Sequence, residues 1–173
     1  MRNALDGSNV RIETPDGSHS IMLRERITAE MKAAMKAGEK QKLSTVRMIQ
    51  AALKDRDIAA RGEGKGETGE DEILALLQKM IKQRQEAAGV YEQGGRPELA
   101  ESERAEAEII QTFLPQQLDE AEMRTAIADA IAETGAESPK DMGKVIGALK
   151  GKYTGRMDFG RASALVKDAL AGK

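Results

Sequence analysis

The sequence predicts an all-α protein, and three observations support this prediction. Strong helix formers, mainly Ala, Leu, Glu, Lys, Met, Gln and Arg, dominate its 173 residues, while β-branched residues are scarce. Apolar residues recur at spacings of three and four along most of the chain, which is typical of amphipathic helices. Gly and Pro fall between these periodic segments, where helices end and begin. Because aromatic residues make up only 2% of the chain, we expect an aliphatic, Met-rich core.

The first periodic segments lie in the N-terminal half. Residues 1–21 show no helical period and lack the apolar stretch of a signal peptide, so we interpret 1–21 as a disordered tag or extension. Apolar spacing predicts helices over 22–37, which Gly38 ends, and over 40–60. Residues 61–69 contain four glycines and no apolar residue, which favours a surface loop.

Two longer helices follow this loop. The first opens near Thr68, whose hydroxyl can cap free backbone amides, and runs to about Tyr91. The second begins at Pro97, where the missing N–H costs nothing, and ends before Pro115. It is strongly acidic. We therefore expect an N-terminal helical domain over 22–115.

Shorter helices are predicted after Pro115. A capping box of Asp119 and Glu122 opens one, the Ser138-Pro139 pair opens the next, and the last follows Asp158. Three short helices in about 55 residues are typical of a small bundle. We therefore expect a C-terminal three-helix domain over 119–173.

Composition excludes several kinds of chemistry. The chain has no Cys and one His, His19 in the extension, so thiol nucleophiles and Cys-ligated zinc are impossible. The serines are isolated, and acidic pairs such as Glu103 and Glu106 lack the histidine of a di-iron site. We therefore expect no catalytic residue, metal or cofactor. No apolar run approaches the roughly 18 residues of a membrane span, so we expect no membrane contact and a cytoplasmic protein.

Charge is distributed unevenly behind a net value of −2. Residues 22–61 carry a net charge of +5, residues 62–138 carry −11, and residues 139–173 carry +5. In the last region lysines and arginines alternate with glycines, which let backbone amides approach a ligand closely. Phosphates, including a nucleic-acid backbone, are therefore plausible partners, although such charges are more often a solvated helix face.

Six short motifs resemble the GatB/YqeY family. They are Leu43-Ser-Thr-Val-Arg-Met-Ile49, Ile81-Lys-Gln-Arg-Gln-Glu86, Gly95-Arg-Pro-Glu-Leu-Ala-Glu-Ser-Glu103, Phe113-Leu-Pro-Gln-Gln-Leu118, Asp141-Met-Gly-Lys-Val-Ile-Gly147 and Lys152-Tyr-Thr-Gly-Arg-Met-Asp158. They occur in order from Met22 onward and together are specific. The chain is similar to the tail of the B subunit of the tRNA-dependent amidotransferase.

The resemblance implies a non-catalytic tRNA-binding module in translation. It would be accessory to glutamine-dependent tRNA amidation, the carbon–nitrogen ligase activity of the parent complex, and would act beside an amidotransferase or an aminoacyl-tRNA synthetase. Carried over by position, the residues expected to contact the tRNA backbone are Gly143, Lys144, Gly147, Lys150, Lys152, Gly155 and Arg156.

Two alternatives remain open at this stage. The acidic helices between Glu70 and Leu114 favour a helical protein–protein adaptor with no nucleic-acid role. The second alternative is an independent amidotransferase enzyme, which would turn over glutamine; we expect no such turnover. Arg47 and Arg84 lie in helices beside acidic neighbours, so we interpret both as ion-paired structural residues.

Overall fold

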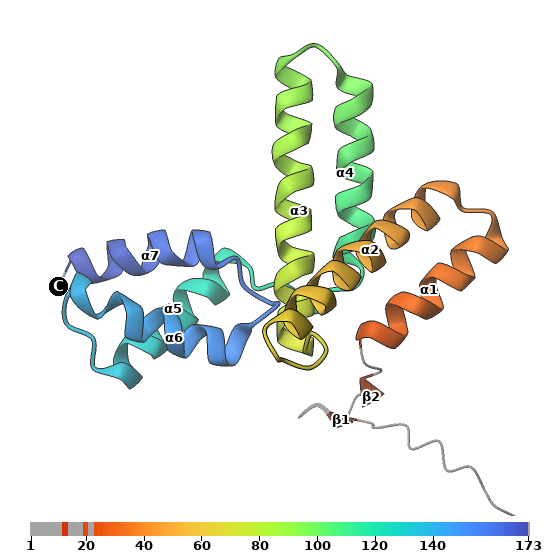
Figure 1. The fold of residues 1–173 in the computed structure, drawn as a ribbon. Helices are drawn as coiled ribbons and strands as arrows, with labels where there is room; N and C mark the ends of the chain where they lie inside the picture. The colour runs from red at the N-terminus through yellow and green to blue at the C-terminus, as the bar shows by residue number, and fades with distance from the viewer. Residues whose placement is uncertain (1–11, 14–18, 21–22, 173) are drawn as a thin grey trace, which may run out of the picture.

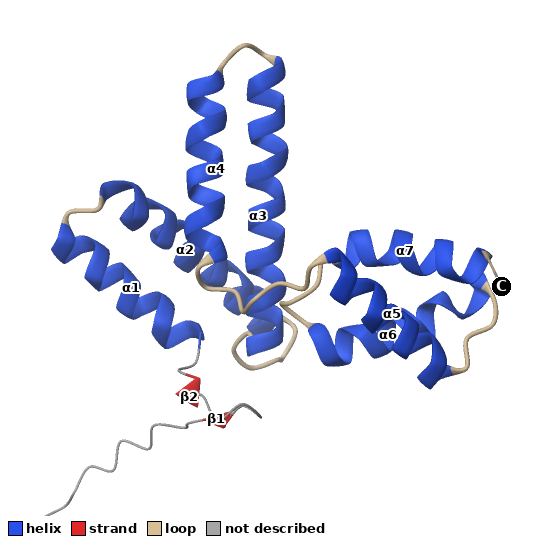
Figure 2. Ribbon diagram, turned by 180° about the vertical axis from the view of Figure 1, so that it is seen from behind, coloured by secondary structure: helices blue, strands red, loops and turns tan. Residues whose placement is uncertain are grey.

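Seven α-helices, one 3-10 turn and two two-residue strands build the described part of the chain, in a computed structural model that describes residues 12–13, 19–20 and 23–172. The all-α fold class is therefore confirmed (Figures 1 and 2). The helices are α1 (Leu23–Ala37), α2 (Lys40–Gly62), α3 (Glu70–Gln93), α4 (Pro97–Gln111), α5 (Glu120–Thr134), α6 (Met142–Tyr153) and α7 (Phe159–Ala171), with the 3-10 turn at Pro139–Asp141 before α6.

The predicted extension contains one local pairing. Two-residue strands β1 (Ile12–Glu13) and β2 (His19–Ser20) pair antiparallel, with Ile12 opposite Ser20 and Glu13 opposite His19. The rest of the segment that the sequence predicts to be disordered lies outside the described residues. No described helix is long and apolar enough to cross a bilayer.

Two helical hairpins form the first part of the molecule. α1 and α2 make one, α3 and α4 make the other, and α2 crosses the base of the second hairpin (Figure 1). Figure 2 shows the same hairpins from behind. Aliphatic residues fill the crossing, with Val46, Ile49 and Leu77 fully buried and Phe113 beside them.

A second, separate hydrophobic cluster lies among α5, α6 and α7. It buries Val145, Leu149 and Met157 completely and receives Ile127 and Ile131 from α5. Each part of the chain therefore has its own buried cluster. That 22–115 and 119–173 are separate domains stays a prediction.

A buried carboxylate, that of Asp57, joins three segments of the first part. Its two oxygens accept hydrogen bonds from the Arg24 guanidinium, at 2.9 and 3.1 Å, and one of them also accepts from the Thr68 backbone N–H, at 2.9 Å. The Arg24 hydrogen bonds, with that of Thr68, hold the pKa of Asp57 well below its usual range. Thr68 is thus not the helix cap that the sequence predicts: Gly69 is the N-cap of α3.

The two parts meet at the loop before α7. Gly155 is buried there with φ +78°, and a Cβ on it would lie 2.8 Å from Leu74 Cδ1 of α3. Around it, the Gln78 side-chain amide donates to the Met157 carbonyl at 3.1 Å, and that of Gln117 donates to the Gly155 carbonyl. Gly155 is therefore required by both its backbone conformation and this contact.

Replacing this glycine tests the contact. We expect Gly155→Ala to lower the free energy of unfolding by about 2–3 kcal/mol, because the methyl group must displace Leu74 and φ is unfavourable. The matched control is Gly147→Ala, where a Cβ meets nothing within 4 Å. It should stabilise α6 by up to about 1 kcal/mol. Urea unfolding of both variants measures these changes in the free energy of unfolding. Equal effects of the two substitutions would contradict a structural role for the contact between Gly155 and Leu74.

Replacing the buried carboxylate gives a pH-dependent effect. We expect Asp57→Asn to cost about 1–3 kcal/mol at pH 7, since the charged hydrogen bonds to Arg24 are lost. Because the folded-state pKa of Asp57 is lowered, its contribution is present above the unfolded pKa of about 3.9 and is lost as the pH falls. The difference from wild type should shrink between pH 5 and pH 3. Asp55→Asn, at an exposed position on the same helix, is the control.

Candidate interaction surfaces

The C-terminal residues that the sequence predicts as anion contacts do not form one group. Gly143, Gly147 and Lys150 share a stripe on the exposed side of α6, and Lys144 lies about 100° round the helix from Gly143. The Lys144 ammonium is 3.5 Å from an oxygen of Asp141, and its side chain is 70% exposed. Lys150 lies over the Phe159 ring, 5.9 Å from its centroid.

The other predicted contacts are engaged within the protein. The Lys152 ammonium donates to both oxygens of Glu133 at 2.7 Å, and this lysine faces away from Lys150 on α6. Arg156 donates through Nε to the Gln116 carbonyl at 3.1 Å, and its own carbonyl accepts from the Leu118 N–H. With Gly155 buried against Leu74, this loop is a structural junction between the two parts.

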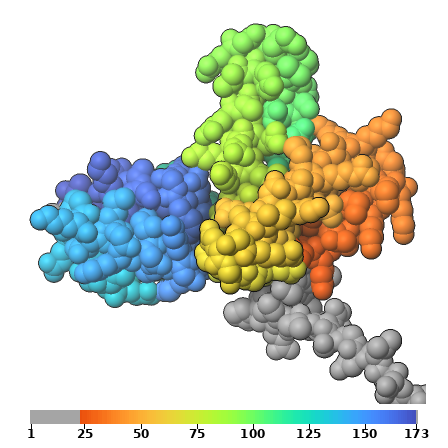
Figure 3. Space-filling view, viewed as in Figure 1, coloured from red at the N-terminus to blue at the C-terminus, as the bar shows by residue number. Residues whose placement is uncertain are grey.

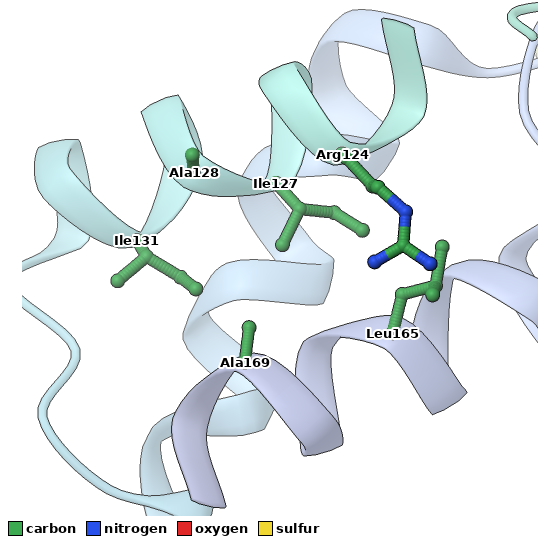
Figure 4. A pocket seen from close by; sticks show the side chains of 6 residues that line it. All are labelled: Arg124, Ile127, Ala128, Ile131, Leu165 and Ala169. Atoms are coloured by element: carbon green, nitrogen blue, oxygen red, sulfur yellow. The ribbon is translucent and has the colours of Figure 1, made fainter. Parts of the chain in front are cut away.

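An apolar groove runs between α5 and α7, with a volume of about 310 Å³. Figure 4 shows Ile127 and Ile131 of α5 facing Leu165 and Ala169 of α7, with the Arg124 guanidinium reaching toward Leu165. Arg124 forms an ion pair with Glu120, which also contacts Arg161.

A cluster of charged residues joins α3 to α4 and contacts α2. The Arg84 guanidinium of α3 lies 3.2 Å from an oxygen of Glu103 and 3.4 Å from one of Glu106, both on α4. It also donates to the sulfur of Met48 on α2 at 3.0 Å. This confirms the ion-pair interpretation for Arg84, whereas Arg47 is exposed and forms no ion pair with a described residue.

Glu106 is the member of this cluster whose buried carboxylate lacks hydrogen bonds from the described residues. Its Oε2 and the Arg84 Nε are both buried, and within the described structure neither has a hydrogen-bond partner. Burial raises the pKa of the Glu106 carboxyl, although Arg84 opposes the shift. The cluster therefore stabilises the crossing only while the arginine is present.

The connected end of the second hairpin projects beyond the rest of the molecule (Figure 3). In Figures 1 and 2 this end stands clear of α1, α2 and the C-terminal helices. Its buried residues, Ala88 and Ala100, are small, while Val90 is 68% exposed. Residues 85–104 carry five acidic and two basic residues. The two basic residues pair within the hairpin, Arg96 with Glu98 and Arg104 with Glu92, so net negative charge remains.

These features define a small all-helical protein whose charged groups are arranged on surfaces and at helix junctions. Among the described residues, no group of three or more His, Cys, Asp or Glu side chains is placed to hold a metal ion. A family model described as Yqey-like protein matches residues 24–170, and the chain belongs to this family. The resemblance to the GatB/YqeY family is thus confirmed.

Curated relatives share one name, "Altered inheritance of mitochondria protein 41, mitochondrial". The protein from Pyrenophora tritici-repentis is 29% identical over 151 residues, which cover 86% of this chain and 81% of the relative. That from Clavispora lusitaniae is 34% identical over 92 residues, 53% of this chain and 51% of the relative. That from Saccharomyces cerevisiae strain YJM789 is 23% identical over 131 residues, which cover 73% of this chain and 69% of the relative.

These names overturn two expectations. The cytoplasmic expectation is wrong, because the relatives are named as mitochondrial proteins. The expectation of a tRNA-binding module in translation, accessory to tRNA amidation, is also wrong, because these names mention neither tRNA nor amidation. Of the residues expected to contact tRNA, Lys152 and Arg156 have partners within the protein, whereas Lys144 and Lys150 are exposed on α6.

Removing the central arginine should leave the buried Glu106 carboxylate without its countercharge. We expect Arg84→Gln to lower the free energy of unfolding by about 1–3 kcal/mol at pH 7, because Glu106 then lacks its countercharge. A carboxyl whose pKa is raised on folding destabilises the protein as the pH rises through that pKa. The loss should therefore lessen as the pH is lowered from 7 to 5. Denaturant unfolding across this range, with exposed Arg47→Gln as control, measures it.

Proposed function

We propose that this chain is a non-catalytic binding protein that acts in the inheritance of mitochondria, the process named in its relatives. In this proposal the projecting α3–α4 hairpin docks on a basic surface of a partner protein. The observation that carries the proposal is the form of the hairpin: it extends beyond the core and is acidic.

The small contribution of the hairpin end to stability supports a role in binding a partner. Its far end buries alanines, which contribute little hydrophobic free energy, so it adds little to stability. Exposed Glu86 and Glu101 form no ion pair with a described residue and are available to a basic partner. Complementary charge of this kind increases association rates and favours one class of partner over another.

Complementation in yeast tests the proposal. A Saccharomyces cerevisiae strain that lacks the relative would receive this chain behind a mitochondrial targeting sequence. We expect mitochondrial inheritance to be restored by the wild-type chain and reduced at least about tenfold in the double variant Glu86→Lys/Glu101→Lys, since charge reversal repels a basic partner.

A matched variant separates docking from net charge. Asp129→Lys/Asp168→Lys makes the same charge change at exposed positions of the C-terminal bundle and should restore inheritance like wild type. All variants should unfold within about 0.5 kcal/mol of wild type. The proposal fails if the wild-type chain restores nothing or if the hairpin variant restores inheritance fully.

A further inference from the structure

A continuous surface row runs the length of α2, on the side that faces neither α1 nor the second hairpin. With about 100° of rotation per residue, seven positions fall within about 40° of one line along the helix. They form what we name the α2 stripe: Lys40, Leu43, Arg47, Ala51, Lys54, Ile58 and Arg61. All are exposed except Leu43, which is partly buried, and Ile58 is 57% exposed.

The composition of the α2 stripe is regular. Four cations alternate with three apolar residues, and no acidic residue interrupts the row. No described residue forms an ion pair with Lys40, Arg47 or Lys54. Arg61 is 3.9 Å from Glu67, and both side chains are about two-thirds exposed, so this pair is weak. The row therefore presents uncompensated positive charge beside apolar surface.

A shallow, open hollow lies on the N-terminal half of the stripe, lined by residues of α2 alone. Its volume is about 490 Å³, and its lining includes Leu43, Met48 and Ala51, with Lys40 and Arg47 also in the wall. Met side chains adapt to the shape of an incoming apolar group. Met48 is held from behind by the Arg84 guanidinium, so the hollow rests on the charged cluster at the crossing.

We infer that the α2 stripe binds an acidic amphipathic helix of a partner protein, which lies along α2 and places a large apolar side chain in the hollow. Alternating cations and apolar residues at spacings of three and four match a helix that carries carboxylates beside an apolar row. The helix that carries the stripe has 23 residues and is about 34 Å long, enough to pair with five or six turns of a partner helix.

Three other occupants fit this surface less well. A bilayer favours several large apolar or aromatic side chains, whereas Ile58 is the one large, exposed apolar residue of the stripe, beside Ala51 and a partly buried Leu43. A nucleic-acid backbone gains nothing from apolar residues set between the cations. The acidic α4 of a second copy presents Glu98, Glu101 and Glu108 but only Ala105 among them, which leaves the hollow unfilled.

Peptide binding tests the inference on the full chain. The probe is a fluorescent helical peptide of about 18 residues, with leucines at spacings of three and four flanked by glutamates. Fluorescence anisotropy should show binding to wild type and about tenfold weaker binding to Arg47→Glu/Lys54→Glu. A peptide with lysines in place of glutamates should instead bind the double variant more tightly than wild type.

Control variants test separately whether the cations and the apolar residues of the α2 stripe contribute to peptide binding. Lys32→Glu/Lys36→Glu changes two exposed lysines of α1 and should bind like wild type. Ile58→Asn keeps the charge and should weaken binding about fivefold, through lost apolar contact. The hairpin variant Glu86→Lys/Glu101→Lys should bind the peptide normally, so failure of the proposed hairpin function is distinguishable from failure of this inference.

Other results would overturn the inference. These are an absence of peptide binding, equal binding of a scrambled peptide, or no loss in the double variant. Stripe-dependent binding to phosphatidylserine vesicles or to single-stranded RNA, tighter than to the peptide, would assign the surface to lipid or nucleic acid instead. Stripe-dependent self-association in sedimentation would assign it to a second copy of the chain.

Discussion

The hydrogen bonds of Asp57 are the constraint on which the N-terminal part depends. One carboxylate holds α1 through Arg24 and the start of α3 through the Thr68 N–H. The glycine-rich loop after α2 is thereby closed against that helix, which sets where α3 begins. A small aliphatic core with one phenylalanine gives few directional contacts, so this charged, directional interaction selects one arrangement of the two hairpins.

Helices could be predicted closely from the sequence because their signals are local. The capping box of Asp119 and Glu122 is present, and Gly135 ends α5 in the left-handed conformation. The sequence predicts Thr68 as a cap because hydroxyl residues before acidic turns usually cap helices. Its backbone N–H instead serves Asp57, eleven residues earlier, and no local pattern reports such a contact.

Surfaces are harder to predict from the sequence, because they depend on contacts between residues that are distant in the chain. Counting charges correctly located an acidic middle region, but it could not show that Lys152 and Glu133, nineteen positions apart, pair across the bundle. Nor did it separate the two sides of α2: Arg47 and Lys54 lie in the exposed row, whereas Asp57 is buried. Helical spacing carried the signal for the α2 stripe, once the exposed side was known.

The projecting hairpin is also a lever. Its end extends about ten residues, or about 15 Å, beyond Arg84, where α2 crosses. A sideways force at the tip produces a torque about this fulcrum, and the two antiparallel helices resist bending better than one. Load applied at the tip is thus transmitted to the Arg84 cluster and, through Met48, to α2.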